Sequence, residues 1–516
     1  MRMTNKIMQT NSLYNINQTK VAEDKYNTQL TSQSRITRPS DDPVIAIRAL
    51  RLRSNVSTAQ QYYEKNAPDA NQWLDVTSQS LHTITSVITD LYKQVETGVN
   101  KDYTASDMQV LLTQIKQNTE ETYATGNQDY AGRYIFTGYR TDTPLTMQKE
   151  QIDADNKLPE YKITEKIKVN QIDTFNYTDY SVFDTASGAD AANELQIKNA
   201  NIGRIRLSYT NIGNLTDFTD PDGNNIPSIE VTDKDGNAVA TPSFTGYTVA
   251  ADPESAYQQM TAAENSDPVP KTVIYIPKTG ELIYDSNTAK ELGDFITDGG
   301  NIRITYTKNE WLVGDLNPQH YFRCEDSKGI VYNSDGNVDT EITYDVGYNQ
   351  TIQVNTNAAE VFDPGIMRDL DDLNDIVNQF VEIESIRNKY KDEYTALEET
   401  HPDYKNAKRR FDAADKAYTY IRDAVSKRFG DQISRYQQYL DSTNVAITKN
   451  GTRSTRLQLI KDRLESQQST FKELQEENEG IDMTEVAVLL TAAETTYDAA
   501  LMATSKIMQN SLINYI

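Results

Sequence analysis

The sequence predicts an α+β protein whose long terminal helices form a coiled-coil or helical-bundle core around an inserted β-rich centre. Glycine and proline give the first indication. Before Gly98 the chain has only Pro39, Pro43 and Pro68, and after Gly480 it has neither residue type. Helix breakers are therefore confined to the middle of the chain. Apolar residues at helical spacing in both flanks, and strand-like segments separated by turn dipeptides in the centre, complete the prediction.

Composition limits the possible partners. The chain has 516 residues and a formal net charge of -25, with 37% apolar and 25% charged residues. This length accommodates two to four domains, and long helices that each bury one stripe would give such a composition. A strongly acidic chain is repelled by nucleic acid and by anionic lipid, so we expect neither nucleic acid nor membrane as a partner. Any assembly must therefore use specific apolar surfaces.

The N-terminal flank is predicted to be helical, although its first part carries few apolar residues. Within residues 4–34 the apolar residues Ile7, Tyr14 and Val21 are seven apart, too few to hold an isolated helix. Residues 44–97 instead carry a sustained apolar seam, so we expect a long helix packed as in a coiled coil. Pro68 lies inside this seam and predicts a kink or a break. A further helix is expected over 107–122.

The centre reads as β structure. The segment 133–138 is expected to be a strand that ends at a turn. Hairpins are predicted around Lys278–Gly280 and around Lys308–Asn309. Three Asp-Gly pairs are further hairpin signals; they are Asp222-Gly223, Asp235-Gly236 and Asp335-Gly336.

The C-terminal flank returns to helical spacing at Ile366. Breaks are expected at His401-Pro402 and at Asn450-Gly451. Residues 481–516 form a last helical run with apolar residues on two stripes, which predicts burial on more than one side. One N-terminal helix cannot supply that burial, whereas several copies of the chain could.

No residue pattern points to catalysis, a metal or a cofactor. Cys324 is the single cysteine, and the three histidines lack metal-binding spacing. The Asp-rich turns near Gly223 and Gly236 lack the oxygen ligands that an EF-hand needs. A His320–Cys324 nucleophile pair is weighed at roughly one in thirty against an idle thiol. No run of 18 apolar residues predicts a membrane span, and the N-terminus lacks the apolar core of a cleaved signal peptide.

The segment Arg38-Pro39-Ser40-Asp41-Asp42-Pro43 is the most specific in the chain. Its residue types predict a helix boundary: Pro39 disfavours helix before it, Ser40 or Asp42 can cap the next helix, and Pro43 suits the first turn. A cap alone accounts for this composition.

The same segment, followed by an Ala/Arg/Leu helix, resembles the N-terminal motif of the flagellar hook-associated protein 3 family, a relative of flagellin. Three further segments are similar to that family: Tyr134-Ile-Phe136-Thr-Gly138, Gly451-Thr-Arg453, and the helix from Met483 to Ile516. The resemblance covers about 1–145 and 450–516 of the chain, and 366–380 more loosely.

This resemblance implies a flagellin-like layout. Residues 1–44 and 480–516 would pair as helices lining an inner tube, 45–145 and 361–479 would form a helical-bundle domain, and 146–360 would form an outer β-rich domain. Residues 384–447 look like an inserted helical hairpin. The C-terminal helix would pack against other subunits and bind an export chaperone through these side chains: Val486, Leu489, Leu490, Ala493, Tyr497, Leu501, Ile507, Met508, Leu512 and Ile516.

The implied function is that of a non-enzymatic adaptor at the hook–filament junction, outside the cell and exported without a cleaved signal peptide. Its partners would be identical subunits in a ring, a hook-associated protein on the hook side, flagellin or another junction or cap protein on the filament side, and a cytoplasmic chaperone. Two alternatives remain open. One is flagellin itself, and the other is an acidic surface enzyme or sugar-binding protein with a coiled-coil stalk.

Overall fold

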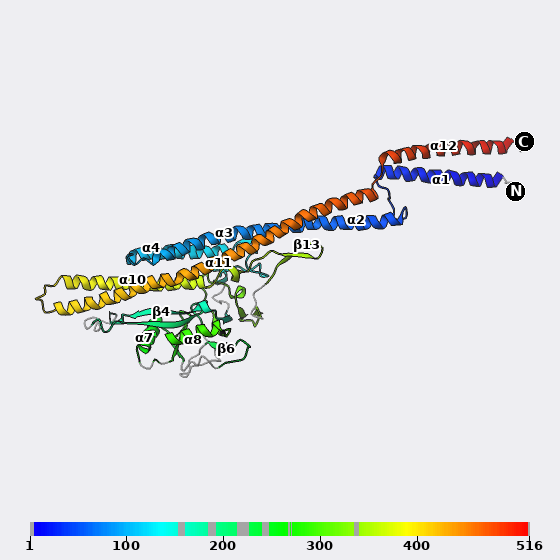
Figure 1. Ribbon diagram of the computed structural model, residues 1–516. Helices are drawn as coiled ribbons and strands as arrows, with labels where there is room; N and C mark the ends of the chain where they lie inside the picture. The colour runs from blue at the N-terminus through cyan, green and yellow to red at the C-terminus, as the bar shows by residue number, and fades with distance from the viewer. Residues whose placement is uncertain are drawn as a thin grey trace. The chain divides into compact units, whose positions relative to one another are not determined.

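The computed structural model describes residues 5–152, 160–183, 192–213, 227–239, 247–266, 269, 271–334 and 340–513. These residues form two compact units (Figure 1). The first unit contains the described part of 1–71, together with 344–352 and 455–513, and the second contains the described parts of 72–343 and 353–454. Long helices at both ends of the chain and strands in its centre confirm the predicted α+β class.

The first unit is built from the two ends of the chain. Helices α1 (Asn5–Ser32) and α12 (Met483–Ile513) lie side by side (Figure 1). Helix α2 (Pro43–Gln61), the start of α3 (Ala67–Gly98) and the last part of α11 (Tyr404–Glu479) belong to the same unit. Strands β13 (Thr343–Gly347) and β14 (Gln350–Gln353) pair as an antiparallel hairpin whose central part also lies there.

Helix α1 turns an unexpected side toward α12. The seven-residue trace of Ile7, Tyr14 and Val21 is exposed at 49%, 62% and 64%. Half-buried residues such as Ile16 and Tyr26 occupy the other side, and the Lys20 ammonium lies 5.0 Å from the centre of the Tyr497 ring. The seven-residue trace therefore does not mark the side of α1 that contacts α12.

Pro68 neither breaks nor ends the helix. A π turn, η1 (Tyr62–Asn66), precedes α3, and the N–H of Ala67 donates to the carbonyl of Tyr62 five residues back. A π turn widens the backbone for one turn and shifts the carbonyl positions that a following proline would otherwise clash with. The predicted break at Pro68 is thus wrong, because a local change of helix type accommodates the proline.

The predicted seam forms the helical core of the second unit. Leu81, Ile84, Ile88, Leu91 and Val95 of α3 are fully buried, as are residues on helices α4 (Ala105–Gly126) and α10 (Gly365–Thr395). The exposed His82 lies outside this seam.

Helices α10 and α11 run from the core into a hairpin, which turns at 396–403. Stacked pairs hold the two helices together: the ring centres of Phe380 and Tyr418 are 5.5 Å apart, and those of Tyr394 and Phe411 are 5.6 Å apart. The break expected at His401-Pro402 is confirmed, whereas the break expected at Asn450-Gly451 is wrong because α11 continues through both residues. Asn450 is buried there, and its amide donates to the carbonyl of Leu74 at 2.9 Å.

The β structure of the second unit forms two larger sheets and a small hairpin. One sheet has the order β12-β11-β3-β10-β6, the other has β4-β5-β9-β8-β7, and β1 pairs with β2. The strands are β1 (Asp129–Tyr130), β2 (Arg133–Tyr134), β3 (Tyr161–Lys166), β4 (Ile172–Asp179), β5 (Lys198–Arg206), β6 (Ser228–Thr232), β7 (Tyr247–Val249), β8 (Val273–Ile276), β9 (Glu281–Asp285), β10 (Asn301–Lys308), β11 (Arg323–Asp326) and β12 (Val331–Tyr332).

Short helices connect and cover these strands. Helix α7 packs on the sheet that contains β4, where Ala256 and Met260 meet Phe175, Tyr177 and Ile202 in one apolar cluster. The short elements are α5 (Lys149–Ile152), η2 (Val169–Gln171), η3 (Ser181–Phe183), α7 (Pro253–Glu264), α8 (Ser286–Thr297), η4 (Pro318–His320) and α9 (Ala358–Val361).

Two of the predicted β features are right and two need correction. Strands β8 and β9 form the hairpin around Lys278–Gly280, and Asp233 to Asn237 make a tight turn at Asp235-Gly236. No hairpin turns at Lys308–Asn309, because β10 ends there and pairs with β3 and β6 instead. The strand expected over 133–138 is only two residues long. The Asp-Gly pairs at 222–223 and 335–336 lie outside the described residues.

A buried network of charges joins the second sheet to helices α10 and α11. Arg204 and Arg206 on β5 are 3% and 4% exposed, and both form ion pairs with Asp372 on α10, at 2.5 and 2.7 Å. The other partners come from β4, β9, α10 and α11; they are Asp173, Glu281, Asp369, Arg428 and Arg435. Four arginines thus meet four carboxylates.

Replacing Asp372 with Asn should destabilise the second unit by about 3–5 kcal/mol, because it leaves two buried arginines and the half-buried Arg428 short of negative charge. Both tryptophans, Trp73 and Trp311, belong to this unit, so urea unfolding followed by their fluorescence measures the effect. Asp415→Asn is the control, since the side chain of Asp415 is 42% exposed and pairs with Arg387 at the surface. That control should cost less than about 1 kcal/mol. Equal effects of the two substitutions would contradict the role assigned to the network.

The network also predicts a specific acid sensitivity. Burial alone would raise the pKa of Asp173, but Arg204 and Arg206 outweigh it and lower that pKa from 3.8 to about 2. A carboxyl whose pKa is lower in the folded state stabilises the fold above its unfolded pKa, and that contribution disappears as the pH falls through its folded pKa. At Asp369 burial outweighs the attraction of Arg206 and raises the pKa to about 6. Asp369 therefore titrates at a higher pH than Asp173.

Between pH 4 and pH 2, unfolding free energy should therefore fall more steeply in the native chain than in an Asp173→Asn variant. Urea unfolding at a series of pH values measures both slopes. Parallel slopes would show that Asp173 does not titrate in this window.

Candidate assembly surface on the terminal helices

The segment that precedes α2 forms the N-terminal cap of this helix. The carboxylate of Asp42 accepts hydrogen bonds from the backbone N–H groups of Val44 and Ile45 at 3.0 and 3.1 Å, and Pro43 is the first helical residue. Asp41 accepts from the N–H groups of Arg38 and Thr37 at 2.8 and 3.1 Å, and these bonds lower its pKa. The two carboxylates thus satisfy backbone donors that would otherwise lack partners at the helix start. Pro39 and Ser40 form the exposed turn before this cap.

The same segment is tied to the other end of the chain within the first unit. The N–H of Arg35 donates to the carbonyl of Glu479 at 2.7 Å, and Ser34 bridges Gly480. The Arg53 guanidinium forms two-pronged contacts with the Glu479 carboxylate, with Nε donating at 2.9 Å. The connection from α1 to α2 and the connection from α11 to α12 are therefore held together.

The remaining motif residues gather in the second unit around the loop that precedes α9. Phe136 is buried against Phe362 with 5.0 Å between ring centres, and its carbonyl accepts from the N–H of Ala358 at 2.8 Å. Arg453 on α11 donates to the carbonyl of Asn355 at 2.7 Å. Asn355 in turn donates to the carbonyl of Thr340 at 2.6 Å.

Backbone geometry requires glycine at one of the two motif glycines and not at the other. Gly138 has φ +61°, and a Cβ there would collide with Thr340, so this turn requires glycine. Tyr134 donates its N–H to the carbonyl of Thr141 at 2.8 Å. Gly451 lies in the interior of α11 with open space around its Cα, so this conformation does not require glycine.

Helix α12 divides its apolar side chains between a covered side and exposed ones. Val486 is buried, and Leu490, Ala493 and Tyr497 are half-buried. Leu489 and Leu501, on the second predicted stripe, are 38% and 42% exposed. Two further apolar residues that the stripes did not include, Val488 and Met502, are exposed at 64% and 69%. Ile507, Met508 and Leu512 belong to the helix, and Ile516 lies outside the described residues.

Threonines on α12 make this surface more apolar than its composition indicates. The hydroxyls of Thr491, Thr495, Thr496 and Thr504 each donate to the carbonyl four residues earlier, at 3.0, 2.8, 2.7 and 2.8 Å. A hydroxyl bonded to its own helix leaves the methyl group as the outward part of the side chain.

One finding corrects the expectation that no segment could span a membrane. Within the described residues, Met483–Lys506 of α12 is long and apolar enough to do so by length and composition, and only 6% of its most apolar stretch is buried. The search for an uninterrupted apolar run missed this segment, because its alanines and larger apolar residues keep the mean hydropathy high although threonines and a few charged residues interrupt the run.

The candidate nucleophile pair has the wrong protonation for catalysis. Burial raises the pKa of the Cys324 thiol to about 12 and lowers the pKa of His320 to about 4. The imidazole Nε2 donates to the carbonyl of Pro144 at 3.2 Å instead. Near neutral pH the thiol is protonated and the imidazole is neutral, which argues against an activated cysteine. The described residues also contain no His, Cys, Asp and Glu grouping suited to a metal ion.

The buried charge network was missed at the level of sequence. Arg204 and Arg206 are two apart on a strand, and Asp369 and Asp372 are three apart on a helix, so each pair shares a face. These spacings were a usable signal, but only the packing of β5 on α10 shows that the two faces meet.

Sequence comparison finds similarity to flagellar proteins. Residues 3–141 match the bacterial flagellin N-terminal helical region. Flagellar hook-associated protein 3 of Escherichia coli (strain K12) is 26% identical over 171 residues, which are 31% of this chain and 54% of that protein. The same-named protein of Salmonella typhimurium is 26% identical over 143 residues, which are 28% of this chain and 45% of that protein. The match thus spans about half the length of these curated relatives.

Solved structures of proteins with related names are less similar in sequence. A putative flagellar hook-associated protein from Vibrio parahaemolyticus has a TM-score of 0.35 at 12% identity, over 85% of this chain and all of that one (100%). The flagellar junction protein FlgL from Legionella pneumophila has a TM-score of 0.27 at 10% identity, over 80% of this chain and 99% of that one. On the sequence matches, residues 3–141 carry the flagellin N-terminal helical region and the chain is similar to flagellar hook-associated protein 3, as its motifs predicted.

Proposed function

We propose that this chain is a structural, non-catalytic adaptor of the bacterial flagellum that joins the hook to the filament. The observation that carries the proposal is the apolar surface of α12 left exposed beside a single polar helix, α1. The similarity to flagellar hook-associated protein 3 supports the location.

Assembly would follow from burial of that surface. Val488 and Met502 are largely exposed in the single chain, and Leu501 is 42% exposed. Full burial of an apolar side chain of this size contributes about 1.5–3 kcal/mol. In a ring, α1 and α12 of adjacent copies would supply the missing contacts. The net charge of -25 would oppose contacts that do not match in shape.

The remaining parts would act outside this inner layer. We propose that 1–44 and 480–516 line the tube, 45–145 and 361–479 surround them, and 146–360 faces outward, with 384–447 as an added helical hairpin. Neighbouring partners would be a hook-associated protein below and flagellin or another junction or cap protein above. Before assembly, a cytoplasmic chaperone would cover α12, and the chain would leave the cell through the flagellar export pathway.

Two other functions make different predictions. A flagellin would occupy the whole filament, but the Pro39-Ser-Asp-Asp-Pro43 frame and the family similarity favour the junction. An enzyme would need an activated group, and the protonation of Cys324 and His320 gives no support to one.

Immunogold electron microscopy with antibodies to residues 146–360 tests the location in motile source cells. A single band of gold where hook meets filament is the expected result. Gold along the filament would make the chain a flagellin, and its absence from accessible flagella would remove the flagellar role.

A separate prediction concerns α12. The double substitution Val488→Glu with Leu501→Glu should abolish junction assembly and motility, because two charges would be buried between subunits. The isolated chain should still fold, since both residues are exposed in it, and the secreted protein level shows whether loss of chaperone binding contributes to the defect. Swimming assays, secreted protein levels and circular dichroism measure these outcomes. Glu494→Gln, at an exposed polar position of the same helix, should swim normally. Normal motility of the double variant would exclude α12 as the assembly surface.

A further inference from the structure

A cavity of about 550 Å³ lies in the second unit, between the sheet that contains β3 and the start of α10. Six cationic residues line it, against three acidic ones, in a chain whose net charge is -25. We call it the cationic cavity; its charged residues are Lys166, Lys168, Arg206, Arg303, Arg323, Arg368, Glu165, Glu230 and Asp363.

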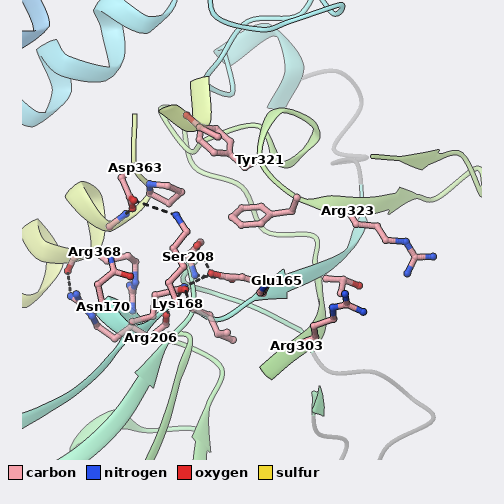
Figure 2. A pocket seen from close by; sticks show the side chains of 18 of the residues that line it. Glu165, Lys168, Asn170, Arg206, Ser208, Arg303, Tyr321, Arg323, Asp363 and Arg368 are labelled. Atoms are coloured by element: carbon pink, nitrogen blue, oxygen red, sulfur yellow. Dashed lines mark hydrogen bonds and ion pairs between the residues drawn. The ribbon is translucent and has the colours of Figure 1, made fainter. Parts of the chain in front are cut away.

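Part of this charge is already neutralised inside the protein. Figure 2 shows Lys168 reaching toward Asp363, at 3.5 Å, and Ser208 against Glu165. The Glu165 carboxylate also accepts from the Tyr306 hydroxyl at 2.9 Å. Arg206 belongs to the buried network, and Arg368 pairs with Asp371 at 2.9 Å. The members of these contacts that line the cavity form its wall; they are Glu165, Lys168, Arg206, Ser208, Asp363 and Arg368.

Lys166, Arg303 and Arg323 are different. They are exposed, and none of the described residues forms an ion pair with them. Figure 2 shows Arg303 and Arg323 extending away from the Lys168–Asp363 and Ser208–Glu165 contacts. Glu230, opposite Arg303 on β6, is the one acidic cross-strand neighbour that the strand register gives them.

Strand register places these three cations on one face of adjacent strands. Arg303 on β10 is directly opposite Lys166 on β3. Arg323 on β11 is opposite Thr164, two residues before Lys166 and on the same face. Directly opposite residues have Cβ atoms about 4.5–5.5 Å apart, and diagonal neighbours about 7–8 Å. Like charges at the first of these spacings repel each other and destabilise the sheet unless something neutralises them.

The floor and wall of the cavity offer further polar contacts. The hydroxyls of Thr164 and Thr305 lie 3.0 Å apart between the two arginines of the sheet. Tyr321 is 8% exposed and lines the cavity, and its hydroxyl has no hydrogen-bond partner among the described residues. Figure 2 shows this hydroxyl pointing away from Arg303 and Arg323, so the cations and the two threonine hydroxyls are the groups available to a ligand beside the arginines.

We propose that the cationic cavity binds an oxyanion, either a phosphate group or the carboxylate of an acidic sugar. Arginine matches both because its guanidinium donates two parallel hydrogen bonds to paired oxygens. Cavities of about 300–1,000 Å³ hold small ligands, so the space suits a single anionic group with an attached sugar-sized body. This site is independent of the proposed junction role.

Isothermal titration calorimetry on the full chain at low ionic strength tests the site with inorganic phosphate, galacturonate and, as a neutral control, galactose. At least one of the anions should bind saturably at one per chain, galactose should not bind, and added salt should weaken binding. Phosphate alone, galacturonate alone, or both would identify the source of the oxyanion.

The double variant Arg303→Gln with Arg323→Gln should bind roughly tenfold or more weakly, since two charged hydrogen-bond donors are lost. Lys198→Gln with Lys290→Gln removes the same charge from exposed residues that do not line the cavity and should leave binding unchanged. Thermal melts confirm that both variants fold. No saturable anion binding, equal binding of galactose, or equal loss in the two double variants would overturn the proposal.

Discussion

The C-terminal helix carries apolar side chains on more sides than the chain itself can cover. Within the first unit, α1 lies beside α12 and covers the side with Val486, Leu490 and Tyr497. Burial of the rest requires other molecules, because apolar surface of this extent is costly to leave in water. The contacts between the motif segment and Glu479 hold the end of α1 beside the start of α12.

The second unit is held together by two kinds of contact. Its helices pack through an apolar seam, whereas its second sheet is attached to α10 and α11 by buried charges. Arg204 and Arg206 stay ionised in the interior because Asp173 and Asp372 lie within 2.5–2.7 Å of one or the other. Such a network is sensitive to the loss of any one member, because its partners are then left buried with uncompensated charge.

Local sequence patterns predicted the helices well and the long-range pairings poorly. Residues from Leu81 to Val95 were placed in a buried seam because helical periodicity is a local property. The break at Gly451 was wrong, since one exposed glycine costs a helix only about 1 kcal/mol and the buried Asn450 anchors the helix beside it. Strand β10 was assigned to a local hairpin, while its actual partners are β3 and β6. Arg303 and Lys166 meet only through that distant pairing, so no local pattern could have indicated the cationic cavity.

The threonines of α12 act as conditional apolar residues. Thr491, Thr495, Thr496 and Thr504 already bond to their own helix, so burial of this surface would leave no hydroxyl without a partner. In water, each hydroxyl can still accept hydrogen bonds from solvent. A helix built this way tolerates both burial and exposure at little cost. Leucine at these positions would favour aggregation in water, and serine would lack a methyl group to pack when buried. Each of these threonines therefore offers a methyl group for contact without leaving its hydroxyl unsatisfied on burial.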